Sequence, residues 1–141
     1  MTANSAILES LTREHRRLDG LLGELFRAIE NRAAEEAGRA IEELDRALRS
    51  HTRMEEEEVF PLLPETDLVP RAQEDPAARL SRELRLEHVQ VRELSGMIRR
   101  LLTEKSEMDG ARVLAANLAR RWDAHTTREE RELPALISDS I

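Results

Sequence analysis

The chain has 141 residues, which is enough for one domain with a buried core, and we expect residues 1–141 to form a single domain. Its net charge of −7, without a basic run, disfavours nucleic acid as a partner, and the lack of cysteine excludes disulfides, iron–sulfur clusters and cysteine-bound zinc. The sequence shows no apolar run of about 18 residues and no signal-peptide pattern near its start. We therefore expect a cytoplasmic protein without a membrane partner.

The composition is typical of an all-α protein, because aromatic residues make up only 2% of the chain and Ala, Leu, Glu and Arg dominate. Three breaks divide the chain, at residues 31–33, 64–75 and 106–110. At the second break Asp75 and Pro76 are a favourable N-cap and first helical residue, and at the third Ser106 and Asp109 have the spacing of a capping box. The predicted helices cover about residues 5–31, 34–63, 76–104 and 109–137.

Each predicted helix carries one apolar stripe with spacings of three and four residues, as the inward faces of bundle helices do. In the first helix the stripe runs through Leu11, Leu18 and Leu25, and the other helices show the same periodicity. Short connections make consecutive helices antiparallel neighbours. The sequence therefore predicts an antiparallel up-down-up-down four-helix bundle.

The chain contains four histidines, one on each apolar stripe: His15, His51, His88 and His125. The midpoints between consecutive histidines fall at residue 33, between residues 69 and 70, and between residues 106 and 107, inside the three breaks. Residues equidistant from the turn of an antiparallel hairpin lie at the same height. The four imidazoles are therefore predicted to meet in one layer of the core.

Two glutamates are expected close to this layer, because Glu55 and Glu129 each follow a histidine by four residues on the same helix face. The two halves of the chain also resemble each other at offsets of 73 and 74 residues. The repeated segments are residues 14–18 and 87–91, and residues 51–56 and 125–130. Two similar hairpins, related by an approximate two-fold axis, would each supply two histidines and one glutamate.

Carboxylates and imidazoles are costly to bury in a leucine core, and no Lys or Arg shares the inward stripes at this level to compensate them. Metal ions are the compensation that we predict, because imidazole with carboxylate suits iron, manganese and zinc. Six ligands would saturate one ion, so we expect two ions bridged by both glutamates and by an oxo or hydroxo group, each with one open position. The predicted ligands are His15, His51, Glu55, His88, His125 and Glu129.

The sequence resembles the hemerythrin-like family of HHE cation-binding domains over nearly its whole length. The motifs that carry the resemblance are Glu14-His15, His51-x-x-x-Glu55-Glu56, Glu87-His88 and His125-x-x-x-Glu129-Glu130. The resemblance implies a hemerythrin-like bundle with a non-haem site of two iron ions. It also implies a protein that binds or senses dioxygen, nitric oxide or peroxide, or buffers iron.

One position departs from the pattern of oxygen-carrying members, which have two histidines one turn apart on the third helix. Here Leu84 and Arg92 stand one turn before and one turn after His88. The missing fifth histidine disfavours reversible oxygen carriage. Glu58 and Glu132, each seven residues after a histidine, are candidate replacement ligands.

Two other functions stay open at this stage. One is a weak di-iron oxidase, peroxidase or catalase-like enzyme, and the other is an interaction module that is metal-free or filled with zinc. The sequence does not identify a protein partner. Among the remaining acidic residues, Glu14 and Glu87 are candidate acceptors that orient a neighbouring histidine, whereas Glu56, Glu57 and Glu130 are interpreted as a solvated face.

Overall fold

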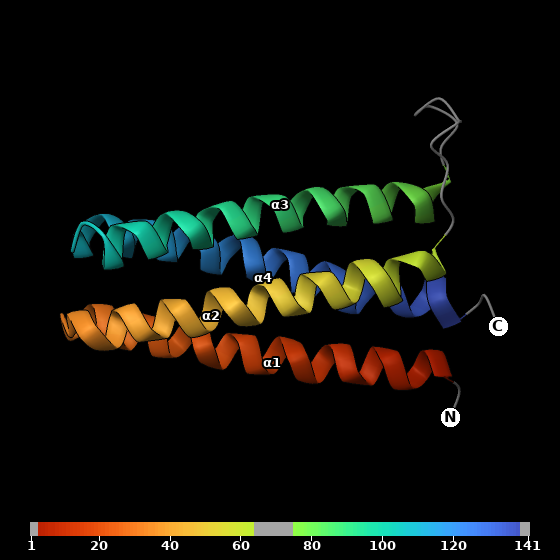
Figure 1. Ribbon diagram of the computed structural model, residues 1–141. Coiled ribbons are helices and arrows are strands. Elements are labelled where there is room, and N and C mark those ends of the chain that lie inside the picture. Colours follow the sequence, from red (N-terminus) through yellow and green to blue (C-terminus); the bar gives the residue numbers. More distant parts are fainter. Residues whose placement is uncertain (1–2, 64–74, 139–141) are drawn as a thin grey trace.

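The computed structural model describes residues 3–63 and 75–138, and these residues form four long antiparallel helices in a bundle (Figure 1). The predicted all-α, up-down-up-down four-helix bundle is confirmed, and the described residues contain no strand. Each long helix packs against two others, so α1 contacts α2 and α4, and α3 contacts α2 and α4. The elements are α1 (Ala3–Glu30), α2 (Ala34–Met54), the π-helix η1 (Glu55–Val59), the 3-10 helix η2 (Phe60–Leu62), α3 (Pro76–Thr103) and α4 (Met108–Ser138).

The structure describes the whole of the first predicted connection but only the end of the second. After α1, the Ala33 amide donates to the Ala28 carbonyl and the Arg32 amide donates to the Ile29 carbonyl, which is the bonding pattern of a Schellman motif. Arg32 has a φ of 52°, in the left-handed region that this motif requires. Of the second connection, residues 64–74 lie outside the described residues, whereas the predicted N-cap is present, because the Asp75 carboxylate accepts from the Ala77 amide at 2.8 Å.

The capping box predicted at the third connection is wrong. Ser106 has a φ of 51°, whereas an N-cap residue normally has an extended backbone, and α4 begins two residues later at Met108. The Glu107 amide instead donates to the Leu101 carbonyl at 2.7 Å. Ser106 therefore belongs to the turn that ends α3, and its side chain does not start α4.

The predicted helix over residues 34–63 is not a single α-helix, because its last part winds into η1 and η2. Pro61 lies ten positions after His51, whereas Pro134 lies nine positions after His125 in the corresponding segment of α4, which remains α-helical. The extra residue is accommodated in the wider π-turn. Such turns are frequent at functional sites.

Two apolar clusters fill the bundle, one on each side of the level of the histidines. The larger apolar cluster is drawn from residues 18–29, 37–48, 91–102 and 108–122. The smaller apolar cluster contains Leu11, Val59, Phe60, Leu63, Ala77, Leu80, Leu84, Leu133 and Ile137. Among the helices of residues 3–63 and 75–138, none is both long and apolar enough to cross a bilayer.

Candidate metal centre

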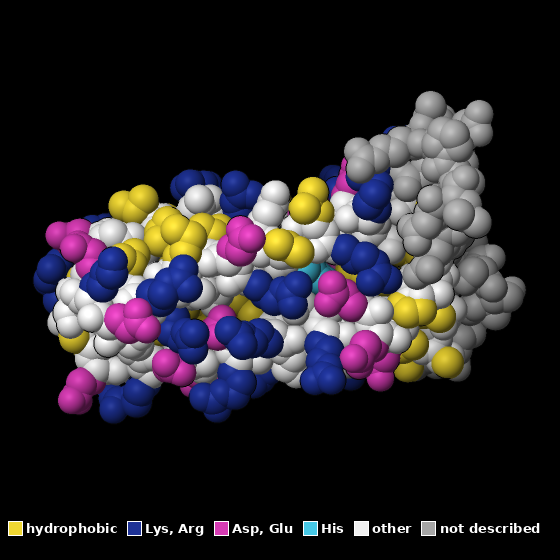
Figure 2. All heavy atoms as spheres, turned by 45° about the horizontal axis from the view of Figure 1, so that its top comes forward, with side chains coloured by type: hydrophobic (Ala, Val, Ile, Leu, Met, Phe, Trp, Pro, Cys, Tyr) yellow, Lys and Arg dark blue, Asp and Glu magenta, His cyan; other side chains and the backbone are white. Residues whose placement is uncertain are grey.

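The structure brings all six predicted ligand residues into one buried group between the two apolar clusters, which we call the histidine layer. Each of these side chains is at most 2% exposed. On the face seen in Figure 2, only a small area of histidine is visible, between charged side chains. The members of the histidine layer are His15, His51, Glu55, His88, His125 and Glu129.

The two glutamates have matching surroundings. Glu55 Oε1 lies 3.0 Å from the Nε2 atoms of both His51 and His88. Glu129 Oε1 lies 3.0 Å from His15 Nε2 and 3.3 Å from His125 Nε2. Each carboxylate therefore contacts the histidine one turn earlier on its own helix and one histidine from the other hairpin. This arrangement agrees with the approximate two-fold repeat of the sequence.

Two overlapping groups of four side chains could each hold a metal ion, and within each group one ligand atom per residue lies within 4.8 Å of all the others. One group contains His15 and His51, the other contains His88 and His125, and both contain the same two glutamates. The geometry therefore offers two positions with two imidazoles each, which share both carboxylates.

Aromatic rings close the histidine layer on both sides. The Trp122 ring centroid lies 5.8 Å from that of His15 and 5.6 Å from those of His51 and His125. On the opposite side Phe60 stacks on His88 with centroids 5.2 Å apart. Both rings are fully buried, and each joins the histidine layer to one of the two apolar clusters.

The polar atoms of the histidine layer fit a cation better than they fit one another. Both ring nitrogens of His15 and of His51, and both oxygens of Glu129, are buried without a hydrogen-bond partner among the described residues. Several of these atoms lie close together, but at angles unsuited to hydrogen bonds. Native proteins rarely leave buried polar atoms unpaired. A set of imidazole nitrogens and carboxylate oxygens that converge in this way suits iron, manganese or zinc.

The buried charges also perturb each other. Burial, and next to it the charge of Glu129, raises the pKa of Glu55 to about 7. Burial, and next to it the neighbouring His15, lowers the pKa of His51 to about 4. For His125 burial acts downward, but contacts with Glu129, Glu55 and Glu87 outweigh it and raise the pKa to about 11. The histidine layer thus combines carboxylates and imidazoles whose proton affinities differ widely from their ordinary values.

Among the described residues, three acidic side chains outside the histidine layer lie within 4 Å of a ring nitrogen. Glu87 Oε1 lies 2.6 Å from His125 Nδ1, in agreement with the orienting contact suggested for it. Glu130, which is 41% exposed, lies 3.6 Å from His15 Nδ1, and Glu56, which is 27% exposed, lies 3.8 Å from His88 Nδ1, so these two partly solvated glutamates also contact histidines. Glu14 makes a 3.6 Å ion pair with Arg17 instead of a hydrogen bond to a histidine.

The two candidate replacement ligands do not face the histidine layer. Glu58 is exposed, and Glu132 is 39% exposed and accepts from Arg128 Nε at 2.9 Å. Leu84, one turn before His88, is fully buried in the smaller apolar cluster. The four-residue groups therefore gain no fifth protein ligand at these positions.

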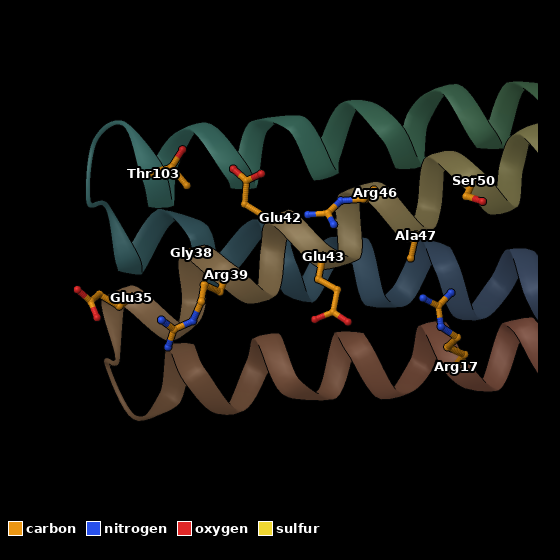
Figure 3. Close-up of a pocket in the computed structure, with 10 residues that line it drawn as sticks. All are labelled: Arg17, Glu35, Gly38, Arg39, Glu42, Glu43, Arg46, Ala47, Ser50 and Thr103. Atoms are coloured by element: carbon orange, nitrogen blue, oxygen red, sulfur yellow. The ribbon is translucent and has the colours of Figure 1, made fainter.

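Two surface hollows differ in their relation to the histidine layer. The larger, about 900 Å³, lies along α2 and is lined by side chains of both charges, such as Arg39, Glu43 and Arg46, with none of the six layer residues (Figure 3). A recess of about 250 Å³ between α3 and α4 reaches His125. Its lining includes Glu87, Val91, Arg121 and Arg128.

The sequence model of one protein family, the hemerythrin HHE cation binding domain, matches residues 6–137. The chain belongs to this family. Comparisons with curated proteins and with solved structures gave no match. Family membership and the two groups of histidine and glutamate side chains together support metal binding.

Proposed function

We propose that this hemerythrin-like chain holds two iron ions in the histidine layer and that the pair of ions binds a small molecule such as dioxygen, nitric oxide or peroxide. The observation that carries the proposal is the sharing of Glu55 and Glu129 by two histidine pairs. One ion would take His15 and His51, and the other His88 and His125. Manganese or zinc would suit the same donor atoms.

The negative charges of the two buried carboxylates favour the binding of cations. Two buried, mutually repelling glutamates cost free energy in the absence of positive charge. Two cations placed between them would compensate both charges and use the ring nitrogens and carboxylate oxygens that lack hydrogen bonds. When bound, the two metal ions would supply redox chemistry and Lewis acidity.

The chain restricts what can reach the ions. Each position offers four protein ligands, which leaves room for a small additional ligand. Trp122 and Phe60 cover the histidine layer, and the recess between α3 and α4 offers the approach to His125. A buried, largely apolar surrounding keeps bulk water away and favours small ligands.

The direct experiment is anaerobic addition of ferrous iron to metal-free protein, metal analysis of the washed sample, and then exposure to oxygen, nitric oxide or peroxide. We expect two iron ions per chain and near-ultraviolet charge-transfer absorption after oxidation. A stable spectral change with each ligand supports binding or sensing, whereas rapid loss of peroxide with release of oxygen supports catalase-like turnover. An unchanged spectrum with no retained iron would refute the proposal.

Variants test the shared carboxylates. Glu55→Ala and Glu129→Ala should each lower the number of tightly bound ions from two toward one or zero, because each removes a ligand of both positions. Glu57→Ala is the matched control, since this side chain lies two residues after Glu55, is 63% exposed and pairs with Arg53. If both ligand variants retain two tightly bound ions, the shared-ligand assignment is wrong.

A further inference from the structure

The two metal positions of the proposed function differ in how their histidines are supported from outside. His51 and His125 are equivalent in the repeat, at an offset of 74 residues, and each lies one turn before a shared glutamate. His125 Nδ1 lies 2.6 Å from Glu87, whereas among residues 3–63 and 75–138 no hydrogen-bond partner is present for His51 Nδ1. The inference that follows rests on the proposed function.

Arg128 holds Glu87 in place. Its Nη1 donates to Glu87 Oε2 at 3.1 Å, while Nε donates to Glu132 at 2.9 Å and Nη2 donates to Glu83. One guanidinium thus joins three carboxylates of α3 and α4, and the Glu87 carboxylate is bonded through both oxygens. Such charge-assisted bonds to a fork-shaped donor define direction as well as distance.

The first hairpin lacks this support. At the same offset of 74 residues, Met54 stands where the second hairpin has Arg128. Glu14, the counterpart of Glu87 at an offset of 73 residues, makes a 3.6 Å ion pair with Arg17 on its own helix. The acidic residue is therefore present in both halves, but within the described part of the chain an arginine of the facing helix directs Glu87, and not Glu14, to a histidine.

The other pair of equivalent histidines is an internal control. His15 Nδ1 lies 3.6 Å from Glu130 and His88 Nδ1 lies 3.8 Å from Glu56. These two contacts are nearly equal, and the two glutamates also correspond at an offset of 74 residues. The asymmetry between the hairpins is therefore concentrated at His51 and His125.

We propose that Arg128 and Glu87 are positioning residues that make the two metal positions unequal, so that the position of His88 and His125 fills first and releases its ion last. A carboxylate that accepts from the second ring nitrogen fixes the orientation of a metal-binding imidazole and increases its basicity, and loss of such a partner typically lowers metal affinity about 10- to 100-fold. The His51 ring must lose more freedom when an ion binds. The two association constants should therefore differ by about the same 10- to 100-fold factor.

The presence of only four histidines makes a residue-specific test feasible. Zinc is added stepwise to metal-free protein, and the ring signals are followed by two-dimensional ¹⁵N–¹H NMR, with each signal assigned by a single His→Gln variant. With up to one zinc ion per chain, the signals of His88 and His125 should change first. Those of His15 and His51 should change with the second ion.

The variant Arg128→Met gives the second hairpin the residue of the first, and it should reduce the difference between the two steps by about 10-fold or more. Arg128→Lys keeps one positive charge and should restore part of the difference. Arg121→Met is the matched control, because this arginine lines the same recess but bonds to Gln90 and Asn117 at the surface. Circular dichroism verifies that each variant is folded, and Arg128→Lys alone tests the proposal if Arg128→Met does not fold.

The outcomes separate this inference from the function on which it rests. Simultaneous changes of all four ring signals in the unaltered protein, or earlier changes of His15 and His51, would overturn the inequality while leaving two-ion binding intact. An unchanged order and separation in both Arg128 variants would overturn the role of that arginine. Absence of any zinc-dependent change in the four rings would refute the proposed metal site itself.

Discussion

The larger apolar cluster and the histidine layer occupy neighbouring levels of the same four helices, but they meet opposite physical demands. Leucine, isoleucine and alanine side chains form most of the cluster, and their burial favours folding without any bound group. The histidine layer buries two carboxylates and four imidazoles, several of whose polar atoms lack hydrogen bonds among the described residues. The difference teaches that stability and ligand binding are largely assigned to separate levels of the bundle.

The largest change in stability is expected from a cavity in the larger apolar cluster. Leu118→Ala removes a fully buried side chain and should lower the free energy of unfolding by about 2–5 kcal/mol. Urea denaturation measures this loss, and the folded variant should retain the metal content of the unaltered protein. Val113→Ala, at a position that is 68% exposed, is the control and should change stability little. A folded Leu118→Ala protein that has lost its metal would contradict the assignment of stability and ligand binding to separate levels of the bundle.

Removal of the metal ions tests the contribution of the histidine layer to stability. Ions that bind only the folded chain add about 2.7 kcal/mol of stability when free metal is 100 times the dissociation constant. Chelator-treated protein should therefore unfold at a lower urea concentration, while its circular dichroism in the absence of denaturant stays helical because the larger apolar cluster is intact. Equal unfolding midpoints with and without added metal would show that the histidine layer contributes no linked stability.

A buried polar pair inside the apolar half should behave like the cluster around it. Ser95 donates to Asp45 Oδ1 at 2.7 Å, and both residues are at most 5% exposed. Ser95→Ala should lower the free energy of unfolding by about 1.5 kcal/mol, because it removes the hydrogen bond to Asp45 and leaves this carboxylate with its ion pair to Arg49. Thermal unfolding compares this variant with Ser50→Ala, which alters an exposed serine of α2. We expect Ser95→Ala to retain its metal content, and a lower metal content would show that this pair affects the histidine layer.

The smallest expected effect has the opposite sign. Arg32 adopts a φ of 52°, a conformation that glycine accepts more readily than other residues, and its ion pair with Asp109 is highly exposed on both sides. Arg32→Gly should therefore raise the free energy of unfolding by about 1 kcal/mol without altering metal content. Asp109→Asn isolates the contribution of the ion pair. A destabilised Arg32→Gly protein would indicate that the ion pair outweighs the backbone strain.

Much of the fold could be predicted from periodicity, and the position of the histidine layer could be predicted from simple distances along the chain. The four histidines lie nearly equidistant from the connections, and antiparallel helices convert this spacing into a common height. The ends of the helices were harder, because Ser106 has the residue type of an N-cap but the backbone of a turn. Residue type alone does not distinguish these two roles.

The outer contacts of the site were less accessible to sequence reasoning. Glu56 and Glu130 are interpreted as a solvated face, and both are partly exposed, but their long side chains also reach a ring nitrogen of a neighbouring histidine. The role of Arg128 depends on carboxylates of another helix, which no local pattern announces. The π-turn did leave a signal, namely the unequal spacing from His51 to Pro61 and from His125 to Pro134.

That π-turn has a consequence for the ring that covers His88. Removal of one exposed residue, such as Glu57, would give the first hairpin the spacing of the second and allow the helix to continue in regular α form. Because the π-turn takes up the extra residue, Phe60 would then stand eight positions after His51, where the second hairpin has the fully buried Leu133 eight positions after His125. The π-turn therefore lets the first hairpin carry one more residue than the second while Phe60 still covers His88, and a chain shortened by this residue should keep that side of the site closed.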